Sequence, residues 1–228
     1  GIQVPESFIY KEIPTHKYTL ASWQKITNLN HPIRIYIEGD GNSFNYAGYP
    51  TSNPTPKGTF LRKIAFNDPN SNVVYLGRPC QYVSDNKCSQ TDWTTGRFSQ
   101  QIIDSTYQAI KQISKKQPVI LIGYSGGALL SGLVIEQHPN LSVKKWITIA
   151  GVLNHSQWTK DLNLPPLKAS VDLVNLPKIQ QIHLVGDKDD TVSYKLTKSI
   201  VSPANLVIIP NATHNRGYEN YKCLIYDE

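Results

Sequence analysis

The chain has 228 residues, of which 39% are hydrophobic, 18% charged and 10% aromatic, close to the average for globular proteins. This length favours one large domain spanning residues 1–228, which can fold without a metal or a dense disulfide framework. The composition excludes a disordered chain, a collagen and a coiled coil. The longest apolar runs, such as Val119 to Ile122, are too short for a transmembrane segment.

The net charge of +6 comes from 23 Lys and Arg residues against 17 Asp and Glu residues. Adjacent basic pairs such as Lys115-Lys116 and Lys144-Lys145 are few, and the remaining basic residues are dispersed along the chain. A nucleic-acid-binding protein would usually gather them on one face, so we expect no nucleic-acid partner. The positive charge still admits peripheral association with an anionic membrane surface.

The first part of the chain predicts mostly strands and loops. In order, we expect an antiparallel pair of strands at 8–13 and 18–26, a strand at 34–38, a loop at 42–58, a short helix at 59–66, a strand at 73–76, and an irregular stretch up to Gly96.

From Arg97 onward, strand patterns alternate with helical patterns. In order, we expect an amphipathic helix of about four turns from Arg97, a strand at 119–123, a helix at 126–138, a strand at 146–151, an insertion at 154–177, a strand at 182–185, a helix at 192–201, a strand at 206–209 and a closing helix at 216–226. This alternation predicts an α/β fold, with a mostly parallel central sheet and helices on both faces.

The segment Gly123-Tyr124-Ser125-Gly126-Gly127 matches the pattern Gly-x-Ser-x-Gly. It lies where a buried strand is predicted to turn directly into a helix, which is the arrangement of a nucleophile elbow. The flanking glycines permit a tight turn, and the helix directs its N-terminal N–H groups toward the serine oxygen. Ser125 is therefore the candidate nucleophile.

A serine nucleophile needs a base, and the base needs a carboxylate that orients it. His214 follows the last predicted strand, at the same edge of the sheet as Ser125, and is the candidate base. Asp187, Asp189 and Asp190 all follow the strand at 182–185, where the site residues of open α/β sheets gather. The spacing alone does not choose between these three aspartates.

The order Ser, Asp, His is that of the α/β-hydrolase triad, and the chain resembles an α/β-hydrolase over nearly its whole length. In that family, the turn after this strand commonly has the pattern Gly-x-x-Asp-x-x-Val, which Gly186, Asp189 and Val192 match. The resemblance therefore implies that Asp189 is the triad carboxylate. It also implies the α/β-hydrolase fold, and a chemistry that requires no cofactor or metal.

The resemblance further implies two backbone N–H donors for the oxyanion of the tetrahedral intermediate. One donor belongs to Gly126, the residue after the nucleophile. The other comes from the loop after the third strand, where the family often has His-Gly-x and this chain has Glu38-Gly39-Asp40-Gly41. The position of x is Asp40, with Gly41 as the alternative if the loop is wound one residue further, and Glu38 departs from the family's histidine.

A narrower resemblance links the chain to poorly characterised bacterial exported or lipoprotein-like α/β-hydrolases. It rests on Tyr75 to Tyr82, Cys88, Trp93, Arg97-Phe98-Ser99, Glu38 to Gly41 and Asn154 to Trp158. It implies that the protein is exported, as a periplasmic, lipoprotein-anchored or secreted protein, and that an N-terminal leader is absent from this chain, which contains no Met.

In an exported protein, Cys80 and Cys88 are expected to form a disulfide, the alternatives being free thiols or half of a metal site. Cys223 is expected to be a buried free thiol.

The predicted function is hydrolysis of a small-molecule carboxylic ester or thioester through an acyl-enzyme. The insertion at 154–177 leaves the sheet at the edge that carries Ser125, so we expect it to form a small cap over the site. The expected substrate-binding residues are Tyr124, His155, Trp158 and Trp93. The alternatives are a small peptidase or amidase, and a catalytically silent scaffold used for binding.

Overall fold

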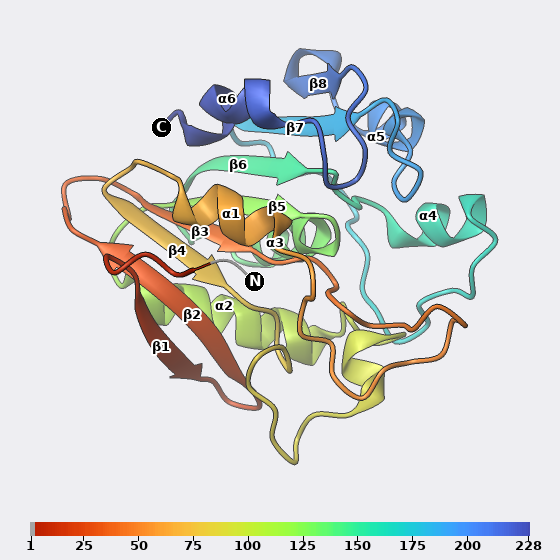
Figure 1. Cartoon of the computed structure of the whole chain (residues 1–228), viewed down its shortest axis with the longest axis horizontal. Helices are drawn as coiled ribbons and strands as arrows, with labels where there is room; N and C mark the ends of the chain where they lie inside the picture. The colour runs from red at the N-terminus through yellow and green to blue at the C-terminus, as the bar shows by residue number, and fades with distance from the viewer. Residues whose placement is uncertain (1–2) are drawn as a thin grey trace.

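Eight strands form one sheet in the computed structural model, which describes residues 3–228 (Figure 1). The strands lie in the order β1-β2-β4-β3-β5-β6-β7-β8. Strand β2 pairs antiparallel with β1 and β4, and all the other neighbours are parallel. The strands are β1 (Ile9–Pro14), β2 (Thr19–Ile26), β3 (Ile33–Ile37), β4 (Asn72–Leu76), β5 (Val119–Tyr124), β6 (Val143–Ile149), β7 (Gln181–Gly186) and β8 (Leu206–Ile209).

Helices cover both faces of the sheet, as Figure 1 shows. One face packs against α1 and α6, and the opposite face packs against α2 and α3, with α5 beside β7. The α-helices are α1 (Phe60–Phe66), α2 (Gln100–Ser114), α3 (Gly126–Gln137), α4 (His155–Asp161), α5 (Tyr194–Ile200) and α6 (Lys222–Tyr226). Short 3-10 helices are η1 (Gln90–Trp93), η2 (Pro203–Asn205) and η3 (Glu219–Tyr221).

The central strands β3 and β5 are buried on both sides because successive side chains point to opposite faces. Ile35 and Leu121 join the core under α2 and α3, whereas Tyr36 and Ile122 join the core under α1. All four side chains are completely buried. The middle of the sheet is therefore a rigid support for the loops that leave its carboxyl edge.

Several element boundaries differ from those expected from the sequence. Helix α2 begins at Gln100 rather than Arg97, because the Ser99 side chain caps it by accepting from the Ile102 N–H. Strand β6 ends at Ile149, where the next residue, Ala150, has φ of 51° and leaves the extended conformation.

The closing helix and the insertion also differ from what the sequence predicts. The predicted closing helix at 216–226 is reduced to η3 and α6, since Gly217 turns the chain with φ of 92°. The insertion at 154–177 is not wholly irregular, because it contains α4, which Asn154 caps by accepting from the Gln157 N–H.

The cysteines follow the expectation in part. Cys80 and Cys88 form a disulfide, with Cα atoms 5.9 Å apart. The prediction for Cys223 is wrong, because its thiol is exposed. Helix α6 has only five residues and buries Ile225, so Cys223 lies on its solvent side.

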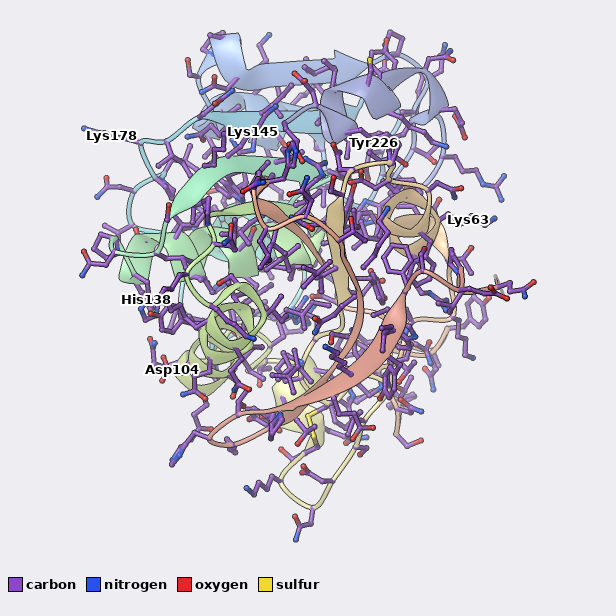
Figure 2. All side chains as sticks on the ribbon, turned by 90° about the vertical axis from the view of Figure 1, so that its left-hand side faces the viewer. Lys63, Asp104, His138, Lys145, Lys178 and Tyr226 are labelled. Carbon is purple, nitrogen blue, oxygen red and sulfur yellow. A yellow bond between two sulfur atoms is a disulfide. The ribbon has the colours of Figure 1, made fainter. Side chains whose placement is uncertain are left out.

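Figure 2 looks onto the amino ends of the parallel strands, on the left-hand side of Figure 1, where Lys145 and Tyr226 lie. Near this end, the buried Arg34 Nε donates to Asp68 Oδ2 at 2.7 Å, and Tyr36 donates to the same oxygen at 2.6 Å. Across residues 3–228, no helix combines the length and the apolar character needed to cross a membrane.

Candidate active site

Ser125 occupies a strained turn between β5 and α3. Its backbone angles are φ of 52° and ψ of −119°, in the region that disfavours side chains. The neighbouring glycines make the turn possible: a Cβ atom on Gly123 would lie 2.4 Å from the Gly127 carbonyl oxygen, and one on Gly127 would lie 2.3 Å from the Ile37 carbonyl oxygen. The structure thus gives Ser125 the geometry of a nucleophile elbow.

His214 and Asp189 complete a hydrogen-bonded chain with Ser125. His214 Nε2 lies 3.0 Å from Ser125 Oγ, and His214 Nδ1 lies 2.8 Å from Asp189 Oδ2. The Asp189 side chain is fully buried, whereas 19% of the His214 side chain is exposed. An ionised Asp189 requires the proton on Nδ1, which leaves Nε2 free to accept the serine proton.

The second carboxylate oxygen of Asp189 is also occupied. Asp189 Oδ1 accepts the backbone N–H groups of Thr191 at 2.9 Å and Val192 at 2.8 Å. These bonds fix the carboxylate so that Oδ2 is turned toward His214. Asp187 instead accepts from the Asn211 N–H at 2.7 Å, so it supports the turn after β8.

The oxyanion donors expected from the resemblance lie beside Ser125. In the part of the chain that the structure describes, neither the Asp40 N–H nor the Gly126 N–H donates to a protein acceptor. Gly41, the alternative, packs so closely that a Cβ atom there would lie 2.1 Å from the Pro54 carbonyl oxygen.

A pocket of about 390 Å³ opens over Ser125, within the range of small-molecule sites. Of the expected substrate-binding residues, Tyr124 and Trp158 line it, and the Trp158 indole N–H donates to the Thr191 carbonyl at 2.9 Å. The lining also includes residues that the sequence did not single out for binding, among them Phe60, Thr191 and Asn215.

His155 and Trp93 lie away from this pocket. His155 is buried with its ring stacked on Phe98 at 5.9 Å, and its Nε2 lies 3.1 Å from the Val171 carbonyl oxygen. Trp93 is buried and donates to the Thr51 carbonyl at 3.2 Å. Both side chains are buried in the loops that surround the site, and neither lines the pocket.

The sequence assigned no role to Glu38 or to the two arginines near the site, Arg78 and Arg97. Glu38 lines the pocket, is buried, and accepts from Tyr75 and from the Gly39 N–H. Burial raises the pKa of Glu38, against these hydrogen bonds. Arg78 and Arg97 bind the Asp40 carboxylate, but they lie in a stretch without periodicity, so only the folded chain brings them together.

In residues 3–228, no three His, Cys, Asp or Glu side chains are arranged to hold a metal ion.

The strand order, with only β2 reversed, and the elbow after β5 define the α/β-hydrolase fold. No family model and no curated protein sequence matches the chain. Solved structures do match it. Est1E from Butyrivibrio proteoclasticus is 14% identical, with a TM-score of 0.65 over 96% of this chain and 94% of that one.

Two further structures agree. A predicted CIB-like hydrolase from Thermoplasma acidophilum is 18% identical, with a TM-score of 0.63 over 96% of both chains. An α/β serine hydrolase without lid from Xanthomonas campestris is 13% identical, with a TM-score of 0.58 over 99% of this chain and 98% of that one. The fold expected from the sequence is therefore confirmed.

Proposed function

We propose that the protein is a serine hydrolase that cleaves small carboxylic esters or thioesters through an acyl-enzyme. The observation that carries the proposal is the hydrogen-bonded chain from Asp189 through His214 to Ser125, which ends at a pocket of about 390 Å³. The names of structural neighbours, which include an α/β serine hydrolase, agree with hydrolysis as the reaction class.

In the first half of the reaction, Ser125 Oγ attacks the carbonyl carbon while His214 Nε2 takes the hydroxyl proton. The negative charge on the carbonyl oxygen is stabilised by the N–H groups of Gly126 and Asp40. When the intermediate collapses, the bond to the leaving group breaks, and His214 returns the proton to the leaving oxygen or sulfur. The acyl group stays on Ser125.

In the second half, a water molecule attacks the acyl carbon and His214 takes its proton. Collapse of this second intermediate breaks the bond to Ser125 Oγ, which regains the proton and releases the acid. Throughout, Asp189 holds the imidazole in one tautomer and stabilises its charged form.

The walls of the pocket support a small cap. Trp158 belongs to α4, in the insertion at 154–177, and it lines the same pocket as Ser125 and Phe60. We assign this insertion as the cap that selects substrates by size. The Cys80–Cys88 disulfide supports an exported protein, because such bonds persist in oxidising compartments.

The test uses a fluorophosphonate probe and a series of nitrophenyl esters. We expect one label on Ser125, with both labelling and turnover lost in Ser125→Ala. Ser199→Ala, a change at an exposed serine in α5, is the matched control and keeps both. A wild-type protein that takes no label and turns over no ester would favour a silent scaffold, and a preference for amides would favour a peptidase or amidase.

A further inference from the structure

Two arginines enclose the carboxylate of Asp40 beside the elbow. Arg97 Nη1 lies 2.7 Å from Asp40 Oδ2, and Arg78 Nη1 lies 3.1 Å from Asp40 Oδ1. The arginine side chains are only 6% (Arg78) and 8% (Arg97) exposed, and the Asp40 side chain is 22% exposed, so both ion pairs are partly shielded from water. The cluster of Asp40, Arg78 and Arg97, here called the arginine clamp, carries one net positive charge.

The arginine clamp packs directly on the first residue of α3. A Cβ atom on Gly126 would lie 2.1 Å from Asp40 Oδ1 and 3.2 Å from Arg78 Nη1. Gly126 is the residue whose N–H follows the nucleophile, so a carboxylate and a guanidinium both stand within a few ångströms of the proposed oxyanion site. Whatever charge the clamp carries acts on that oxyanion at short range.

Side chains around the loop after β3 (residues 38–41), among them Arg78 of the clamp, bind the backbone groups of this loop. The carbonyl of Glu38 accepts from Arg78 at 3.3 Å, and the carbonyl of Gly39 accepts from Gln81 at 3.0 Å. The carbonyl of Asp40 accepts from Ser43 at 2.7 Å, while the Gly39 N–H donates to the Glu38 carboxylate at 2.8 Å. Within residues 3–228, the Asp40 N–H itself donates to no protein acceptor.

The two arginines also keep Asp40 ionised. Burial by itself raises the pKa of Asp40, but the charges of Arg97 and Arg78 outweigh it, and the pKa lies below its ordinary value. An ionised Asp40 without its partners would repel the oxyanion that forms beside Gly126, because like charges in a shielded site interact strongly.

We propose that Arg78 and Arg97 are positioning residues for the oxyanion site. They hold Asp40 so that its N–H is available to the oxyanion, and they offset the negative charge of its carboxylate. This inference rests on the proposed hydrolase function and assigns a role in catalysis to a part of the chain that contributes no member of the triad.

The test compares Arg97→Met, Asp40→Asn and the double variant on a nitrophenyl ester, with rates expressed per site that a fluorophosphonate labels to completion. We expect Arg97→Met to lower kcat by about 100-fold, as for loss of an oxyanion donor, with KM changed by less than about threefold. In the Arg97→Met background, Asp40 keeps only Arg78 as an ion-pair partner, so the cluster has no net positive charge beside the oxyanion. Asp40→Asn restores one net positive charge there, so kcat should recover by about tenfold or more. Arg97→Lys keeps the charge and should retain most of the activity.

Arg34→Met is the matched control, because Arg34 forms an equally short and fully buried pair with Asp68 near the other end of the sheet. It should lower the unfolding midpoint and leave kcat per labelled site within about twofold. The inference is overturned if Arg97→Met behaves like Arg34→Met, or if Asp40→Asn brings no recovery. Should Arg97→Met fail to fold, Arg97→Gln, which also removes the charge, takes its place in the same comparison with and without Asp40→Asn. An unchanged kcat in Arg97→Gln, or no recovery in its double variant, would refute the charge argument. Failure of the hydrolase proposal is distinct, because wild-type Ser125 would then take no label.

Discussion

Replacing Asp189 by Asn is the most informative single change in the proposed triad. Asp189 Oδ1 accepts two backbone N–H groups, from Thr191 and Val192. The amide oxygen of Asn must take that position, because only an acceptor satisfies both donors. The amide N–H2 group then faces His214 Nδ1, which has to become an acceptor. The proton of the imidazole moves to Nε2, the nitrogen 3.0 Å from Ser125 Oγ, which can no longer take the serine proton.

The expected loss in kcat is about 10⁴-fold, equivalent to about 5.4 kcal/mol in the barrier, as for other triads forced into the wrong tautomer. The fold should be kept, because both backbone hydrogen bonds to residue 189 survive. Turnover of a nitrophenyl acetate, normalised to the folded fraction from circular dichroism, measures the loss. Asp187→Asn is the control and should cost less than about threefold, since Asp187 contacts the Asn211 N–H rather than the imidazole. Equal losses in the two variants, or a loss below tenfold in Asp189→Asn, would refute the reasoning.

Four further predictions concern stability, the accessibility of a thiol, and substrate specificity. Replacing Cys80 and Cys88 by Ser should lower the free energy of unfolding in urea by about 2.6 kcal/mol through loss of loop constraint, and the exposed Cys223 should be alkylated in the native protein, which a mass spectrum would detect. Trp158→Ala should shift the preferred acyl length in a nitrophenyl ester series while changing acetate turnover only a few-fold; an unchanged profile would exclude Trp158 from the specificity pocket. Burial lowers the pKa of His183 to about 4, so the unfolded chain binds a proton more readily between pH 6.5 and 4 and stability falls as the pH falls through this window. His183→Gln should remove that part of the pH dependence of urea unfolding, and an unchanged slope would contradict it.

The fold was predictable because its signals are local and strong. The uninterrupted apolar strand at 119–123 and the amphipathic pattern after Ser99 require only side-chain periodicity. Their neighbours in the sheet follow from the alternation of strands and helices. Boundaries were less accurate where one residue decides them, as at Ala150 and Gly217, whose positive φ values no hydrophobic pattern reveals.

The candidate site was predictable where its residues follow strand ends. Ser125, Asp189 and His214 each lie just after a parallel strand, so the topology carries them to one edge. His155 also follows a strand, yet its ring packs against Phe98 instead of lining the pocket. A short stretch of sequence does not reveal which way a loop side chain points, so this placement could not be predicted. The arginine clamp depends on contacts across 38 and 57 residues, and nothing in the local pattern reports them.

The position of β8 has a consequence for when the proposed hydrolase becomes active and for how it loses activity. His214 follows this strand, which has only four residues and is an edge strand that pairs with β7 alone. Ser125 stands in the rigid centre, 89 positions earlier in the chain. During synthesis, His214 emerges after Ser125 and the loop that follows β3, so the proposed triad is complete only once this last strand has paired with β7. On heating or in mild denaturant, rim strands detach before the centre opens, so hydrolysis should disappear while most of the secondary structure is still intact.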